Sequence, residues 1–180
     1  MQLDYGLQTS LINVTHIAEC PDVAPIECAK GTIPVHKHNQ SLFILRGLAN
    51  FSIGILPKTV LTASLPVEMK NLSVRYITLN EQPFNPPYGD IHHRNETLYG
   101  FGDVTLAAKY YILTEPGNLL NFQLGTSLPI GRIEEDPYQL TEKGLTHQHL
   151  QFGSGTFMPM VGMEWNFNNF FSWGQLQASL

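Results

Sequence analysis

Charged residues are scarce in this sequence. Asp, Glu, Lys and Arg make up 14% of its 180 residues, against roughly 25% in an ordinary soluble domain. The formal net charge is only -5, so the chain offers no basic patch for nucleic acid, and we expect no nucleic-acid partner. Disorder is also excluded, because disordered chains have few aromatic residues, whereas aromatic residues reach 11% here.

Long apolar runs are missing as well. No segment approaches the ~18 consecutive apolar residues of a membrane-spanning helix. The 3.6-residue periodicity of an amphipathic helix is almost absent. Glycine and proline are plentiful instead, with 15 and 12 residues. The regular signal that remains is alternation with period two, broken by turn residues, and it predicts an all-β protein.

Seven segments alternate between apolar and polar residues. The predicted strands cover residues 2–14, 41–56, 59–78, 98–114, 118–130, 152–167 and 170–180. The long connections between them cover residues 15–40, 79–97 and 131–151. Long and short connections alternate strictly, so in an up-and-down meander all the long loops share one rim. Short turns on one rim and long loops on the other are typical of outer-membrane β-barrels.

A soluble β-sandwich or a lipocalin-like barrel, with its apolar face turned inward, would give the same alternation. The polar faces, however, carry small and amide side chains more than the Lys and Glu of a solvated surface. Predicted strands of up to about 20 residues also exceed the usual 3–10 of globular proteins, whereas membrane strands often continue beyond the bilayer. We therefore predict an antiparallel up-and-down meander that is part of a transmembrane β-barrel. Its expected location is the bacterial outer membrane, in contact with lipid.

Residues 1–180 are expected to form a single β-barrel domain. No signal peptide is recognisable, because the chain alternates like a strand from its first residues. The other end stops inside a strand-like pattern. Bacterial single-chain barrels normally have an even number of strands, at least eight. The seven predicted strands therefore indicate a barrel that is truncated at its C-terminus.

Two cysteines, Cys20 and Cys28, are present, and both fall in the first long loop. A disulfide between them is expected if the compartment is oxidising. Two free thiols are the alternative. Their spacing is not CxxC, which disfavours a redox centre or a zinc ribbon.

Three glycine-rich motifs follow one another in the second half of the chain. The sequence reads GFGD at 100–103, GTSLPIG at 125–131 and QFGSGT at 151–156. Across residues 98–167 this order resembles the transporter-like outer-membrane barrels grouped as the "MetA-pathway of phenol degradation" family. The resemblance implies an outer-membrane barrel that moves small solutes, hydrophobic or aromatic ones among them. The histidine-bearing loops are not part of the family pattern, and the family name implies no catalysis.

Six of the seven histidines occur in pairs, one pair in each predicted long loop. The pairs are His36 and His38, His92 and His93, and His147 and His149. If the long loops share a rim, the pairs meet there, and imidazole is a ligand for transition metals such as Zn and Cu. A metal-binding outer-membrane protein is therefore an alternative function. Two other interpretations stay open: ordinary polar loop residues, or a plug that opens as imidazoles titrate near pH ~6.5.

The polar faces of the predicted strands carry charges of both signs. Residues expected to face the lumen are Arg46, Glu68, Lys70, Asp103, Lys109 and Glu164. They fit a water-filled channel, or else they pair and fill a narrow barrel. Ser154 lies in Gly-Ser-Gly without the GxSxG spacing, so we expect no enzyme. The sequence predicts a porin-like channel for the passive passage of small-molecule solutes.

Overall fold

The structure is a computed structural model that describes residues 1–18, 33–87, 94–116, 118–134, 136, 139–140, 143, 145, 150–167 and 170–177. Its strands are β1 (Gln2–Ala18), β2 (His36–Leu56), β3 (Thr59–Thr78), β4 (Glu96–Phe101), β5 (Val104–Glu115), β6 (Asn118–Leu128), β7 (Met158–Phe167) and β8 (Phe170–Gln177). None of the helical residues in these ranges forms a helix that is long and apolar enough to cross a membrane.

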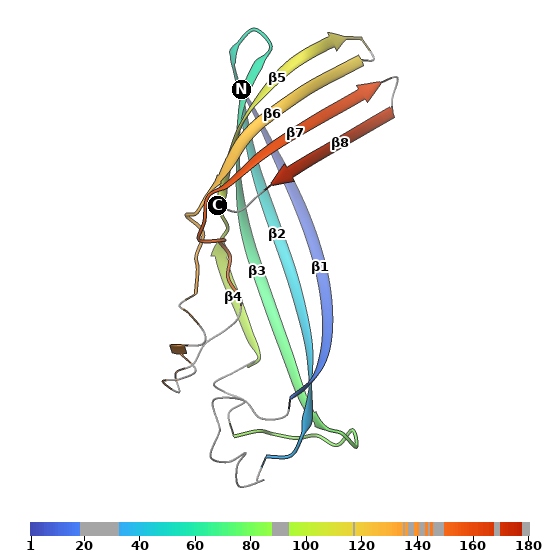
Figure 1. The fold of residues 1–180 in the computed structure, drawn as a ribbon, viewed down its shortest axis with the longest axis vertical. Helices are drawn as coiled ribbons and strands as arrows, with labels where there is room; N and C mark the ends of the chain where they lie inside the picture. The colour runs from blue at the N-terminus through green and yellow to red at the C-terminus, as the bar shows by residue number, and fades with distance from the viewer. Residues whose placement is uncertain are drawn as a thin grey trace.

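The strands form one antiparallel sheet in the order β1-β2-β3-β5-β6-β7-β8. β3 pairs with β5 through residues 59–64 and with β4 through residues 67–72. β4 and β5 therefore share one strand position, and the sheet is a meander of seven positions, as predicted. Figure 1 shows this sheet curled like part of a barrel wall. Within the described residues β1 and β8 are not paired with each other, so the curl stays open.

Short and long connections alternate along the sheet, which confirms that prediction. Short ones join β2 to β3, β5 to β6 and β7 to β8. Long ones join β1 to β2, β3 to β4 and β6 to β7. The β2–β3 turn and the segment that follows β3 therefore lie at opposite ends of the sheet (Figure 1).

Several predicted strand ends are wrong. Residues 15–18 and 36–40, expected in a loop, pair with each other as the ends of β1 and β2. The strand expected at 98–114 is interrupted at Gly102 and Asp103. The strand expected to begin at residue 152 begins at Met158. Both interruptions have one cause, the packing around Asp103 described below.

The two faces of the sheet differ in chemistry. We call the face that carries Arg46 and Glu68 the inner face, and the opposite face the outer face. On β1–β3 the outer face bears an apolar band, which comprises Leu3, Tyr5, Leu7, Leu11, Phe43, Leu45, Ala49, Phe51, Ile53, Ile55, Leu61, Ala63, Leu65, Val67 and Met69. Thr9 is the one polar side chain among them. The inner face behind the band is polar, with residues such as Gln8, Asn50 and Ser64.

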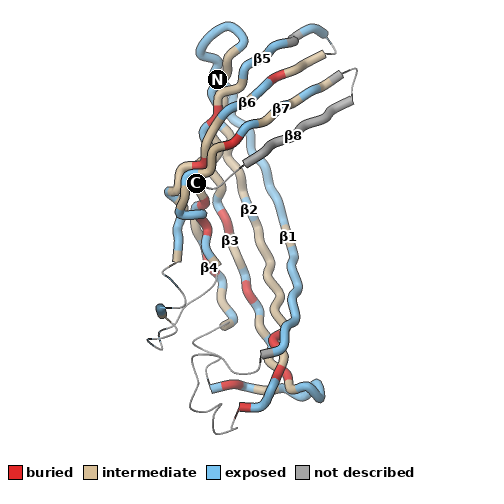
Figure 2. The backbone as a smooth tube through the Cα atoms, viewed as in Figure 1, coloured by how far each residue is buried: buried red, intermediate tan, exposed pale blue. Residues whose placement is uncertain are grey.

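This polarity reverses at one row of the sheet. Ile12, Leu42 and Leu72 are paired across β1, β2 and β3, and all three lie on the inner face. Beyond this row the inner face combines apolar residues such as Val14 and Val74 with buried His36 and His38, and Leu72 is 5% exposed. We call residues 12–18, 36–42 and 72–78 the distal sheet. Figure 2 shows buried residues on both β2 and β3 along this part of the sheet.

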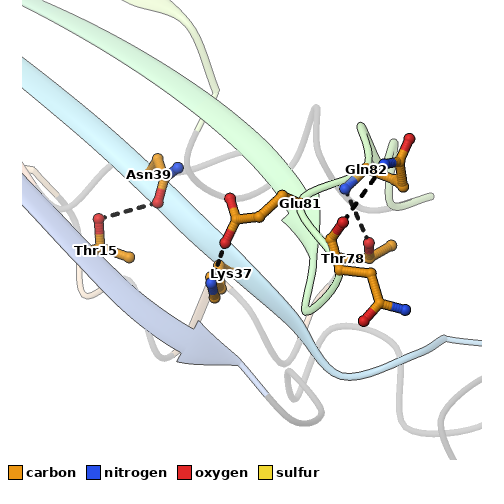
Figure 3. A network of polar contacts seen from close by, with 7 residues as sticks. Thr15, Lys37, Asn39, Thr78, Glu81 and Gln82 are labelled. Atoms are coloured by element: carbon orange, nitrogen blue, oxygen red, sulfur yellow. Dashed lines mark hydrogen bonds and ion pairs between the residues drawn. The ribbon is translucent and has the colours of Figure 1, made fainter.

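The outer face of the distal sheet is polar apart from Ile17 and Ile77. Thr15 Oγ1 donates to Asn39 Oδ1 over 3.0 Å, and Lys37 forms an ion pair with Glu81 in the segment after β3. Figure 3 shows these contacts on neighbouring strands. A buried inner face behind a mainly polar outer face is typical of an antiparallel sheet with one solvated side.

Candidate functional site on the inner face

An ion triad lies on the inner face between β2 and β3. Arg46 and Glu68 are direct cross-strand partners. Arg46 Nε donates to Glu68 Oε1 over 2.7 Å. Lys70 Nζ lies 3.2 Å from Glu68 Oε2, a charge contact that is not aligned as a hydrogen bond. Glu68 is only 3% exposed, and a carboxylate buried to that degree needs the compensation that these two cations provide.

Lys70 also joins β3 to the chain segment that precedes β7. Its Nζ donates to the backbone oxygen of Gln151 over 2.5 Å and lies 4.8 Å from the ring centroid of Phe152. The Phe152 ring is buried against Gly100 of β4. A Cβ at Gly100 would lie 2.6 Å from Phe152 Cδ2, so only glycine leaves room for the ring. An aromatic side chain is thereby held against the inner face.

Asp103 lies in the interruption between β4 and β5 and accepts three hydrogen bonds. Gly131 N donates to Oδ1 over 2.9 Å. Ser154 N and Ser154 Oγ donate to Oδ2 over 2.7 and 2.6 Å. Hydrogen bonds to a carboxylate are roughly twice as strong as neutral ones. The Asp103 carboxylate therefore fixes the end of β6 and the approach to β7 against β5.

Close backbone contacts reinforce this junction. A Cβ at Gly131 would lie 2.7 Å from Gly153 Cα and 2.8 Å from the carbonyl carbon of Gly102. The amides of Phe152 and Gly153 both donate to the Arg132 oxygen over 2.9 Å. Because three backbones meet here, regular strand pairing stops. This explains why β4 and β5 are separate and why β7 begins late.

A cavity of about 580 Å³ opens on the inner face between the triad and this junction. Its lining includes the polar residues Gln8, Arg46, Ser64, Glu68, Asp103, Thr105, Ser127 and Ser154 and the apolar residues Leu48, Pro66, Phe152 and Met158. The lining thus combines ionic groups, hydroxyl groups and an apolar wall. Cavities of ~300–1,000 Å³ with this mixture are typical of small-molecule sites.

A second charged group lies on the inner face closer to the short turns. Lys109 Nζ lies 3.5 Å from Glu164 Oε2, and Asn121 Nδ2 donates to the same oxygen over 2.9 Å. The structure thus places all six predicted charged residues on one face, in two groups. Arg46, Glu68 and Asp103 line the cavity, and Lys70 contacts Glu68 from outside the lining, whereas Lys109 and Glu164 form the second group, also outside it.

The prediction that His36 and His38 lie in a loop is wrong. Both are buried residues of β2. The His36 Nδ1 atom lies 2.7 Å from the Pro34 oxygen, so it carries the proton and donates. The two Nε2 atoms are 3.0 Å apart. The ring of His16, which the sequence did not single out, lies 4.6 Å from that of His38.

The described residues give little support to the predicted metal site. Among the described residues no group of three or more His, Cys, Asp or Glu side chains is arranged to hold a metal ion. The other candidate residues, His92, His93, His147, His149, Cys20 and Cys28, lie outside the described residues.

Sequence reasoning missed the contacts of Phe152, Gly153 and Ser154. The signal was present, because the GFGD, GTSLPIG and QFGSGT motifs each supply a residue to the Asp103 junction. The sequence order alone does not show which backbone amide a carboxylate meets across the sheet.

No family model matches this chain, and no curated protein or solved structure matches it. The resemblance to the phenol-degradation barrel family therefore stays a prediction. The fold itself, a curled antiparallel meander, rests on the strand pairing described above.

Proposed function

We propose that this chain forms part of the wall of a bacterial outer-membrane β-barrel through which small solutes pass passively. One observation carries the proposal. On β1–β3 the outer face bears an apolar band without a charged residue, and the inner face behind it is polar. That arrangement suits a wall with lipid outside and water inside.

The dimensions of the band support a bilayer. It runs from Leu3 to Leu11 on β1 and from Leu61 to Met69 on β3. Each stretch is close to the ~9–11 residues with which a barrel strand spans the hydrocarbon core. The reversal at the row of Ile12, Leu42 and Leu72 then marks where the strands leave it.

The exposure of large apolar side chains supports the same environment. Outer-face residues that are exposed include Tyr5, Leu7, Phe51, Val67, Tyr99, Tyr110, Leu124, Val161 and Trp165. They extend over β1–β7, and a patch of that extent marks a surface that meets something other than water. Lipid covers such a surface without needing a partner of matching shape.

The proposal also makes a demand on the sheet edges. Hydrocarbon cannot hydrogen-bond to the free N–H and C=O groups of an open edge. In the membrane, the edges of β1 and β8 must therefore be paired, with each other or with further strands, so that the barrel closes. Solutes then move through the polar interior, past the cavity at Arg46 and Asp103.

Conductance of the full chain in a planar lipid bilayer tests the channel directly. We expect stepwise, ohmic current at low voltage, since a polar lumen carries hydrated ions. Folding is checked independently by β-sheet circular dichroism in the same lipid. A folded, membrane-inserted protein without conductance would contradict the channel and leave only a structural barrel.

Metal binding is a second candidate function, and one observation favours it. His36 and His38 direct their Nε2 atoms at each other, and the Nδ1 atom of His36 is anchored on a backbone oxygen. Metal-ligating histidines are commonly oriented by such a carbonyl. Calorimetric titration of the full chain with Zn²⁺ and with Cu²⁺ tests this function. Equal affinity of the native protein and of His38→Ala for both ions would remove it.

A further inference from the structure

The most exposed charge in the lining of the inner-face cavity is positive. Glu68 is 3% exposed and has a cation at each carboxylate oxygen, and the Lys70 side chain is 12% exposed. Asp103 is less exposed than Arg46, and both of its oxygens accept hydrogen bonds, from Gly131 and Ser154. The Arg46 side chain, in contrast, is 44% exposed and lines the cavity. The guanidinium group of Arg46 is therefore the charged group that a solute in the cavity reaches most readily.

Arg46 can bind a solute without releasing Glu68. Its contact with Glu68 uses the Nε atom, and a guanidinium group has five N–H donors. The terminal nitrogens suit a carboxylate, whose two oxygens match the planar fork of the guanidinium group. Glu68 fixes the Arg46 side chain, so less conformational entropy is lost when a solute binds.

The remaining lining indicates what the carboxylate should be attached to. Leu48, Pro66, Phe152 and Met158 provide an apolar wall, and the Phe152 ring is held in place by Gly100 and Lys70. The carboxylates of Glu68 and Asp103 also line the cavity. They would repel a second negative charge on the same solute.

We propose that this cavity is a selectivity site for small monocarboxylates with an apolar body, bound through Arg46. The proposal rests on the proposed function, since it names the class of solute that the channel prefers. Neutral solutes of equal size bind more weakly, because they forgo the charge-assisted hydrogen bonds to Arg46. Dicarboxylates bind more weakly because of Glu68 and Asp103.

Calorimetric binding to the full chain in detergent micelles tests the proposal with three matched probes. These are hexanoate, its neutral isostere hexanamide, and the dicarboxylate adipate. Hexanoate should bind about tenfold more tightly than hexanamide, the difference expected for a hydrogen bond to a charged group. Adipate should bind with lower affinity than hexanoate. Equal affinity for hexanoate and hexanamide in the native protein would overturn the proposal, whether or not any variant folds.

Two substitutions locate the site. Arg46→Gln should abolish the preference for hexanoate and leave the affinity for hexanamide unchanged, and Arg46→Lys should keep part of the preference. Lys109→Gln is the matched control, because Lys109 is also an inner-face cation paired with a carboxylate but lies outside the cavity lining. A preference that survives Arg46→Gln, or that is lost in Lys109→Gln, would refute the assignment to Arg46.

The binding experiment and the conductance experiment test the site and the channel independently. Selective binding by a protein that does not conduct would remove the channel and keep the site. Conductance without preference for hexanoate would keep the channel and remove the site.

Discussion

The apolar band and the distal sheet are built from the same three strands, but their apolar residues lie on opposite faces. In the band Val67 points outward and Glu68 inward, whereas in the distal sheet Ser73 points outward and Leu72 inward. Both regions alternate with period two, but the apolar residues change sides at one row. The comparison teaches that the sheet continues without a break while its apolar residues change face. Under the proposed function, this row is where the outer face passes from lipid to water.

This reversal explains the length of the strands. β2 and β3 have 21 and 20 residues, roughly twice what a bilayer requires. The excess residues form the distal sheet, which has its own small core. Under the proposed function, these residues extend beyond the bilayer. Leu72 and the ring contact between His36 and Phe84, at 4.8 Å, belong to that core.

The largest effect should come from a charge placed on the outer face of the band. Val67→Arg should lower the free energy of unfolding in lipid vesicles by about 2–4 kcal/mol, the cost of an arginine near the bilayer midplane. Ser73→Arg, on the same face of the same strand but in the distal sheet, should change it by less than about 0.5 kcal/mol. Urea titration of the vesicle-bound protein measures both. Equal costs at the two positions would mean that the two surroundings do not differ.

Loss of a buried side chain should separate the regions in the opposite sense. Leu72→Ala should destabilise the distal sheet by about 2 kcal/mol, because it leaves a cavity in a small core. The effect should appear as faster amide exchange in residues 72–78, with exchange in residues 61–69 unchanged. Ser73→Ala serves as the neighbouring control. Uniform acceleration along β3 would show that the two regions unfold as one unit.

The Asp103 junction should tolerate almost no added volume. Gly131→Ala should cost about 1–2 kcal/mol, because its Cβ would overlap the backbones of Gly153 and Gly102 and packed regions resist added atoms. Gly54→Ala is the control, since a Cβ there meets nothing within 4 Å. Thermal unfolding of both variants in the same detergent provides the measurement. An unchanged unfolding temperature in Gly131→Ala would contradict the close approach of the three backbones.

The smallest effect should be on the surface of the distal sheet. Lys37→Ala removes an ion pair whose side chains are 26% and 65% exposed. Pairs of this kind contribute about 0–1 kcal/mol and are screened by salt. The unfolding midpoint should therefore shift slightly at low ionic strength and not at high. A large shift that salt does not change would show that Lys37 supports the core.

Much of the fold was predictable because alternation survives in every strand. Strand order, antiparallel pairing and the alternation of short and long connections followed from the positions of turn residues. The ends of β1 and β2 were missed because the apolar residues change sides at Leu42, so the pattern appeared to stop there. His36 and His38 were placed in a loop for that reason.

The candidate site was predictable only in part. Arg46, Glu68 and Lys70 were identified because they interrupt apolar alternation with charge. Their pairing depends on the cross-strand register, which places Arg46 opposite Glu68. Phe152 and Ser154 were not identified, because they reach Lys70 and Asp103 only through a connection that folds back onto the sheet.

A scan of the outer face of β3 with nitroxide spin labels in lipid vesicles tests the central claim most directly. Single cysteines would be placed at positions 61–75 in the full chain, with Cys20 and Cys28 replaced by serine. We expect odd-numbered positions from 61 to 69 to be accessible to oxygen dissolved in lipid, and positions 71, 73 and 75 to a water-soluble nickel chelate. Nickel accessibility at all of the odd-numbered positions would contradict the account, because the apolar band would then face water.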